Sequence, residues 1–250
     1  MLFEFLADIA KLAFYIVCAY ALLNAYTRRR KPRWALPFTK RRLAVLGLLT
    51  LGVGAIKVIE DVVAQESGPV DEAILWFIRQ HVPSGLTAYF GAFTRSGSAA
   101  FLVPAAVVAT GMLLVARRRF EAVLVGVSLA TATLVVYGLK AIVGRTRPAL
   151  WESQWYWGSS FPSGHTLSTA AFATAGALCI ARIWPCAGNL AMSIAMLWTF
   201  LVALSRLILG VHWPSDVLAA VCIGFFIPLS ISVAFDLRRP ATVATLGRNP

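Results

Sequence analysis

Long apolar runs dominate the pattern of hydrophobic and polar positions along this chain. Seven stretches contain no Asp, Glu, Lys or Arg, and they cover residues 12–27, 43–56, 96–116, 122–139, 164–181, 183–205 and 217–235. A helix needs about 20 apolar residues (range about 17–25) to cross the hydrocarbon core of a bilayer. The first two runs are shorter, but they reach that length if Asp8, Lys11, Lys57 and Glu60 extend their charged ends to the interface. The pattern therefore predicts seven transmembrane helices in an all-α, polytopic membrane bundle.

The composition agrees with this prediction and excludes most soluble classes of protein. Apolar residues make up 59% of the chain and charged residues only 14%, whereas a soluble domain has about 45–50% and about 25%. The four cysteines lie in or beside the apolar runs, at no spacing typical of a metal site or a disulfide framework. A soluble globule, a disulfide scaffold, a disordered chain and a zinc module are therefore excluded.

The net charge of +12 would by itself indicate a nucleic-acid partner. The distribution of the charge along the chain decides between this interpretation and a membrane topology. The segments after the first and third runs, Arg182 and the C-terminal tail together hold 15 basic residues and two acids. The other segments hold eight basic and nine acidic residues. By the positive-inside rule the first set is cytoplasmic, which places the N-terminus outside and the C-terminus inside. Topology thus accounts for the excess charge, and no nucleic-acid partner is expected.

Two segments between the runs are long enough to hold structure of their own. Residues 71–79 have the apolar spacing of a helix that lies along the membrane interface. The second segment, residues 143–162, carries the aromatic cluster Trp151, Trp155, Tyr156 and Trp157. These aromatic residues form either an ordinary interface belt or a lip that holds a lipid near a site.

Polar clusters stand at the ends of the last four runs, and the first two clusters have clear local signals. Lys140 and Arg147 are about two helical turns apart, so on a continued helix they project from one face, although Pro148 discourages further helix. Residues 162–165 read Pro-Ser-Gly-His directly before the fifth run. Backbone N–H groups at such a helix start form an anion cradle.

The third cluster lies in the loop that joins the sixth and seventh runs. It begins with Ser205-Arg206, continues with His212 after five residues and ends with Asp216 after three more. Each cluster alone has an ordinary interpretation, as interfacial flank residues, a turn, or a local hydrogen bond that fixes a loop. The charge-based topology, however, puts all three on the outer side, and this convergence favours a common site.

Together the clusters describe a site for phosphoryl transfer. Lys140, Arg147 and Arg206 supply three cations, which repel one another unless an anion binds between them. The two histidines and the carboxylate supply a nucleophile, an orienting group and an acid. No set of Asp and Glu able to hold a divalent metal lies among them, so chemistry without a metal or other cofactor is expected.

The pattern Lys-x6-Arg-Pro, Pro-Ser-Gly-His and Ser-Arg-x5-His-x3-Asp resembles the signature of the type-2 phosphatidic acid phosphatase superfamily of integral-membrane lipid phosphatases. All three motifs match in order and completely, from Lys140 to Asp216. The resemblance implies a six-helix phosphatase core over residues 43–236. An added transmembrane helix and basic loop over 1–42 would precede this core, and a cytoplasmic tail over 237–250 would follow it.

The same resemblance implies a role for each residue at a motif position. His212 would be the nucleophile that forms a phosphohistidine, Asp216 would hold its other ring nitrogen, and His165 would protonate the leaving oxygen. The residues expected to bind the phosphate and the charge that builds in the transition state are Lys140, Arg147, Ser163, Gly164 and Arg206.

The function that these residues favour is hydrolysis of a lipid phosphate or diphosphate at the outer face of the cell (inner) membrane. Candidate substrates are undecaprenyl diphosphate, phosphatidylglycerol phosphate, phosphatidic acid and the phosphates of lipid A. Arg145 lies inside the first motif and points away from the Lys140 face, where it either meets a second phosphate or is an interfacial flank residue; the first reading favours undecaprenyl diphosphate. A different class, a non-enzymatic transporter or lipid-binding protein, would use the cations but leave the histidines and Asp216 without a role.

Overall fold

Helices form nearly all of the chain that the structure describes. The computed structural model describes residues 2–30, 32, 34–151 and 158–238, and it describes the side chains of these ranges except those of 2–7, 36, 37 and 40. The aromatic residues Trp155, Tyr156 and Trp157 and the tail from Arg239 onward lie outside the described residues. Within the described ranges there is no strand, and the predicted all-α class is confirmed.

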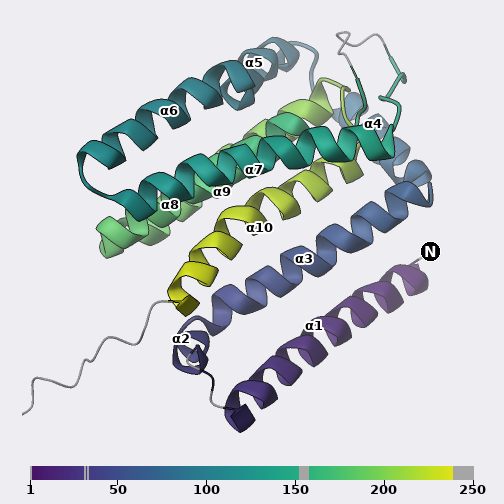
Figure 1. Cartoon of the computed structure of the whole chain (residues 1–250). Coiled ribbons are helices and arrows are strands. Elements are labelled where there is room, and N and C mark those ends of the chain that lie inside the picture. Colours follow the sequence, from purple (N-terminus) through teal and green to yellow (C-terminus); the bar gives the residue numbers. More distant parts are fainter. Residues whose placement is uncertain (1, 31, 33, 152–157, 239–250) are drawn as a thin grey trace, which may run out of the picture.

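Ten α-helices and two 3-10 turns follow one another along the described residues (Figure 1). The elements are α1 (Leu2–Arg30), α2 (Ala35–Lys40), α3 (Arg42–Val63), α4 (Gly68–His81), α5 (Leu86–Phe93), η1 (Thr94–Gly97), α6 (Ala99–Val115), α7 (Arg119–Val143), α8 (Gly164–Ile183), η2 (Pro185–Ala187), α9 (Gly188–Ile208) and α10 (Pro214–Arg238). The helix predicted around residues 71–79 is α4. The short helix α2 lies in the segment that the sequence suggested only as a basic loop.

Six of the seven predicted spans are single helices long and apolar enough to cross a membrane, namely α1, α3, α7, α8, α9 and α10. The predicted third span differs, because α6 has only 17 residues. It reaches spanning length only together with α5 and η1, from which it is bent by 40°. The break has a packing reason: a Cβ added at Gly97 would lie 2.8 Å from side-chain atoms of both Thr169 and Val202. The 3-10 turn thus comes very close to α8 and α9.

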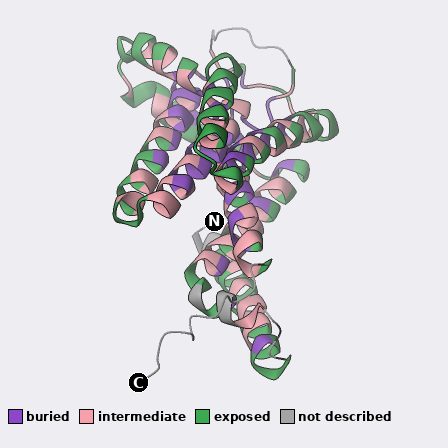
Figure 2. Cartoon of the chain, turned by 60° about the vertical axis from the view of Figure 1, so that its left-hand side comes forward, coloured by how far each residue is buried: buried purple, intermediate pink, exposed green. Residues whose placement is uncertain are grey.

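The helix α8 lies at the centre of the bundle and packs against α6, α7, α9 and α10. Its buried face is rich in alanine, and small residues let membrane helices approach closely. The approach is tightest at α10, where a Cβ on Gly224 would come within 2.5 Å of the Ala170 Cβ. Buried residues gather on the facing sides of the helices (Figure 2), while large apolar side chains such as Leu134 and Ile142 are exposed, as expected on a lipid-facing surface.

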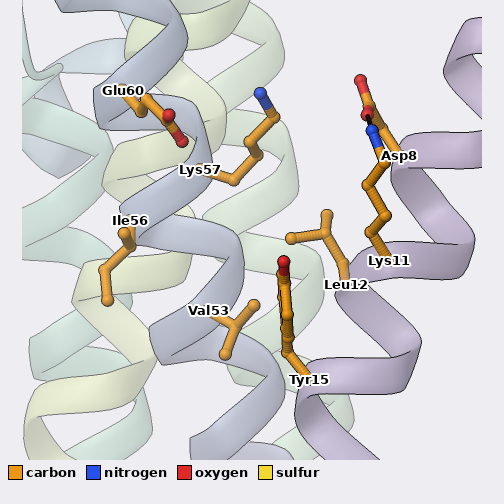
Figure 3. A pocket seen from close by; sticks show the side chains of 8 residues that line it. All are labelled: Asp8, Lys11, Leu12, Tyr15, Val53, Ile56, Lys57 and Glu60. Carbon is orange, nitrogen blue, oxygen red and sulfur yellow. Dashed lines mark hydrogen bonds and ion pairs between the residues drawn. The ribbon is translucent and has the colours of Figure 1, made fainter.

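The first helix, α1, lies at the edge of the bundle beside α3 (Figure 1). None of the residues in its most apolar window is buried. Near the N-terminal end of α1, a crevice of about 460 Å³ separates the two helices (Figure 3). Three of the four charged residues expected there to reach the interface are paired within their own helices, Lys11 with Asp8 at 3.0 Å and Lys57 with Asp61 at 2.6 Å.

The two ends of the bundle differ in charge, as the sequence predicted. The basic end, which we define by Arg41, the 117–119 loop and Arg182, contains the acid Asp236, which pairs with Arg182 at 2.7 Å and with Arg41 at 2.9 Å. The Arg182 guanidinium also lies over the Phe120 ring, 4.5 Å from its centre. The opposite end, which we call the site end, holds the last turns of α7 and α9 and the first turns of α8 and α10.

Candidate active site

The first motif straddles the end of α7. Lys140 lies in the last turn, and the helix ends at Val143 because Gly144 adopts a left-handed conformation with φ of 62°. The expectation of a shared helical face for Lys140 and Arg147 is therefore wrong, since Arg147 lies in the loop beyond. The two cations nevertheless meet: the Lys140 ammonium donates to the Ser159 carbonyl, and Arg147 Nη2 approaches the same oxygen at 3.4 Å.

The second motif forms the start of α8. Ser163 has an extended backbone at the N-cap position, and α8 begins at Gly164. The Ser163 hydroxyl lies 3.1 Å from the Thr166 hydroxyl, and its backbone N–H donates to the Asp216 carbonyl at 3.3 Å. This backbone contact ties the start of α8 to the first turn of α10. The helix start expected at this motif is therefore present, and the first-turn N–H groups of a helix are not used within it and can face an anion.

The third motif turns the chain between α9 and α10. Gly210 has φ of 65°, and a Cβ at this position would lie 2.5 Å from the Trp151 ring. Both the backbone conformation and the lack of space therefore require glycine. The turn returns the chain toward the first motif. Arg147 Nη1 donates to the Val211 carbonyl at 2.8 Å and lies 3.4 Å from His212 Nε2.

The two nitrogens of the His212 ring have different surroundings. Nδ1 lies 3.5 Å from Asp216 Oδ2, while Nε2 faces Arg147. The Asp216 carboxylate is 0% exposed. Its Oδ2 also accepts hydrogen bonds from the backbone N–H of Trp213 at 2.9 Å and from the Ser160 hydroxyl. Asp216 thus lies beside the second ring nitrogen, as the family resemblance implied.

The remaining cation and the second histidine come from α9 and α8. Arg206 is 1% exposed and donates to the Thr94 hydroxyl of η1 at 3.0 Å. His165 lies in the first turn of α8, directly after Gly164. The structure therefore brings all eight residues predicted from the motifs to the site end of the bundle.

Burial sets the protonation state of His212. Removal from water disfavours the imidazolium form and lowers the pKa of His212 to about 4, although the hydrogen bond to Asp216 acts in the opposite direction. The ring is therefore neutral at physiological pH, with a nitrogen lone pair available on the side that faces Arg147.

Arg145 does not lie as either sequence interpretation suggested. Its guanidinium is bound to Asp216 Oδ1 through Nη1 and to Asp71 Oδ2 through Nη2, each at 2.7 Å. Two carboxylates hold the charge that was expected to meet a second phosphate, and the side chain is largely buried and so is no flank residue.

Sequence reasoning missed several polar side chains that complete the site. These are Asp71, Thr94, Ser160 and Ser215, which bind Arg145, Arg206 or Asp216. Ser160 and Ser215 lie within two residues of a motif, which is a usable signal. Asp71 and Thr94 come from the segment before α6, which carries no motif. Among the described residues, no three His, Cys, Asp or Glu side chains are grouped so that they could hold a metal ion.

The fold and this site define a polytopic membrane protein with cations and a histidine–carboxylate pair at one end of a helical bundle. Residues 121–240 match the model of the PAP2 superfamily, and this region contains all three motifs. The resemblance to the type-2 phosphatidic acid phosphatases is thereby confirmed for residues 121–240, which carry the motifs.

Among known proteins, phosphatidylglycerophosphatase B of Escherichia coli strain K12 is 40% identical to this chain over 68 residues. That match covers 27% of this chain and 26% of the relative, so it spans about a quarter of either protein. The protein of the same name from Shigella flexneri matches equally.

Two solved crystal structures share the fold. The transmembrane PAP2-type phosphatidylglycerolphosphate phosphatase of Bacillus subtilis has a TM-score of 0.69 at 24% identity, covering 76% of this chain and 95% of that one. LpxE of Aquifex aeolicus has a TM-score of 0.52 at 23% identity, covering 64% of this chain and 93% of that one. Nearly the whole of each of these proteins thus corresponds to part of this bundle.

Proposed function

We propose that this protein is a membrane lipid phosphatase that hydrolyses a lipid phosphate or diphosphate through a phosphohistidine on His212. The observation that carries the proposal is the arrangement of the His212 ring, with Nδ1 at Asp216 and Nε2 on the side of Arg147. A nucleophile held on one side by a carboxylate and facing a phosphate-binding cation on the other is arranged for attack on phosphorus.

The proposed reaction has two steps. In the first, His212 Nε2 attacks phosphorus, the bond from phosphorus to the lipid oxygen breaks, and His165 gives its proton to that oxygen. In the second, water attacks phosphorus, the bond from phosphorus to Nε2 breaks and returns neutral His212, His165 takes up a proton of the water, and inorganic phosphate leaves. The residues that hold the phosphate oxygens through both steps are Lys140, Arg147, Ser163, the Gly164 N–H and Arg206.

The position of Arg145 bears on the choice of substrate. An Arg145 available for a second phosphate would favour undecaprenyl diphosphate, but Arg145 is instead held by Asp71 and Asp216. Two of the similar proteins are named for phosphatidylglycerophosphate. We therefore place phosphatidylglycerol phosphate first among the four candidates, with the site open to the outer face of the cell membrane, opposite the basic end.

The test is release of inorganic phosphate by the purified full chain in detergent from each of the four lipids, with and without excess EDTA. We expect release from at least one lipid, with phosphatidylglycerol phosphate the best substrate by kcat/KM, and no loss in EDTA because the proposed chemistry uses no metal ion. If none of the four lipids is hydrolysed, the result would favour a non-enzymatic binding or transport function over a phosphatase. Loss in EDTA that magnesium restores would refute metal independence.

The low pKa of His212 predicts an unusual pH profile. Neutral imidazole is present above the pKa and is lost as the pH falls through it, so the His212-dependent limb of kcat/KM should lie near pH 4 rather than near 6.5. The measurement is kcat/KM from pH 3.5 to about 8 with two lipids whose phosphates titrate differently, so that a limb that belongs to the substrate can be recognised. A limb near 6.5 common to both substrates would contradict a buried, neutral His212.

A further inference from the structure

The helix α4 reaches into the site end with a buried carboxylate. Asp71 is 2% exposed, although α4 is otherwise a largely exposed helix that carries exposed charges such as Glu72 and Arg79. Burial of a carboxylate costs several kcal/mol unless partners compensate for the lost water. Asp71 has such partners: Oδ1 accepts the Ser215 backbone N–H at 2.8 Å, and Oδ2 accepts Arg145 Nη2 at 2.7 Å and the Ser215 hydroxyl.

One of these contacts, with Arg145, connects Asp71 to the catalytic pair. Arg145 uses its second terminal nitrogen to bind Asp216 Oδ1 at 2.7 Å, so one guanidinium joins two buried carboxylates. Because Arg145 holds Oδ1 of Asp216, the other oxygen, Oδ2, is the one that lies at His212 Nδ1. The orientation of the Asp216 carboxylate therefore depends on where Arg145 is held.

The contact between Asp71 and the Ser215 backbone N–H fixes the helix that carries Asp216. Ser215 is in the first turn of α10, whose N–H groups have no acceptor within the helix. A carboxylate supplied by another helix satisfies one of these groups and is favoured by the helix dipole. Asp71 thus holds both the guanidinium that orients Asp216 and the backbone that carries it.

The helix α4 also braces the other side of the His212 loop. Trp76 packs edge-on against Trp151 with ring centres 5.8 Å apart, and the Arg79 guanidinium lies 5.5 Å from the centre of the same ring. That ring in turn covers the Gly210 turn that leads to His212.

We propose that Asp71 is a positioning residue for the His212–Asp216 pair, acting through Arg145 and the first turn of α10. This inference rests on the proposed phosphatase function. Without the Asp71 charge, the whole of the Arg145 charge falls on Asp216, which weakens the carboxylate as a hydrogen-bond acceptor for His212 and frees it to rotate. Asp71 itself contacts Arg145 and Ser215 rather than a phosphate-binding cation, so substrate binding should change little.

The experiment is steady-state kinetics of Asp71→Asn, with the best lipid of the panel as substrate and inorganic phosphate as competitive inhibitor. We expect kcat to fall by about 10–100-fold, the range known for residues that orient metal ligands, while KM and the phosphate inhibition constant stay within about threefold. The matched control is Glu72→Gln, the adjacent exposed residue on the same helix, which should keep wild-type kinetics.

A double-variant cycle separates positioning from a general structural role. If Asp71 acts through Arg145, the Asp71→Asn/Arg145→Met pair should lose no more kcat than the worse of the two single variants. Wild-type kcat in Asp71→Asn, losses that multiply, or an equal rise in KM would overturn the proposal. If Asp71→Asn does not fold, Asp71→Glu decides: reduced kcat at unchanged KM supports the role, and full kcat refutes it. An inactive wild type would instead refute the proposed function itself.

Discussion

Replacement of His212 by Ala is expected to lower phosphate release from the lipid substrate by at least about 10⁴-fold, because no nucleophile remains in the position that faces the phosphate. The measurement is kcat/KM of the purified variant, together with its thermal unfolding midpoint in detergent. Truncation of a buried ring beside Asp216 leaves space but no unpaired charge, so the variant should fold.

The third histidine provides the matched control for this substitution. His81 is exposed at the end of α4, where its Nδ1 lies 2.8 Å from the Phe77 carbonyl. His81→Ala should keep wild-type turnover. If His212→Ala also kept it, the assignment of the nucleophile would be wrong, and with it the two-step reaction.

The second large effect is expected for Asp216→Asn. The amide can still accept one hydrogen bond but cannot stabilise the imidazole as a carboxylate does, and the analogous change in a serine protease triad lowers kcat by about 10⁴-fold. We expect kcat to fall by about 10³–10⁴-fold while the inhibition constant of inorganic phosphate changes by less than about tenfold. The measurement is kcat, KM and phosphate inhibition on one preparation.

Asp61→Asn is the matched control for the charge change, since Asp61 is a partly exposed carboxylate of α3 that is bound by Lys57. It should leave kcat unchanged. A loss of phosphate binding in Asp216→Asn as large as the loss of turnover would mean that Asp216 holds the site together rather than orients the nucleophile. Its contacts to Arg145, Ser160 and Trp213 make this outcome a real competitor.

The sequence predicted the fold well because a single physical rule governs most of it. In lipid, an apolar run of sufficient length has few options besides a helix, so the runs identified six spans directly. The exception is the third run, where the chain bends between η1 and α6. That bend depends on the close approach of Gly97 to Thr169 and Val202, which are more than 70 positions later in the chain and cannot be inferred from local pattern.

The same distinction separates the parts of the site that could be predicted from those that could not. Motif spacing identified the groups proposed to meet the phosphate, because each must stand at or near a helix end. It failed for Arg145, whose partner Asp71 lies 74 residues earlier on a helix with no recognisable motif. Spacing also suggested a shared helical face for Lys140 and Arg147, whereas the two meet through the Ser159 carbonyl.

The bend between α5 and α6 has a consequence for the most buried cation. Irregular backbone at membrane depth is tolerated only where protein shields it from lipid, and η1 is shielded by its contacts with α8 and α9. At this interruption Thr94 presents its hydroxyl to Arg206. A straight third span would avoid irregular backbone in the bilayer. It would, however, remove the Thr94 hydroxyl from the buried Arg206 guanidinium, so the bend provides a polar contact for a buried charge.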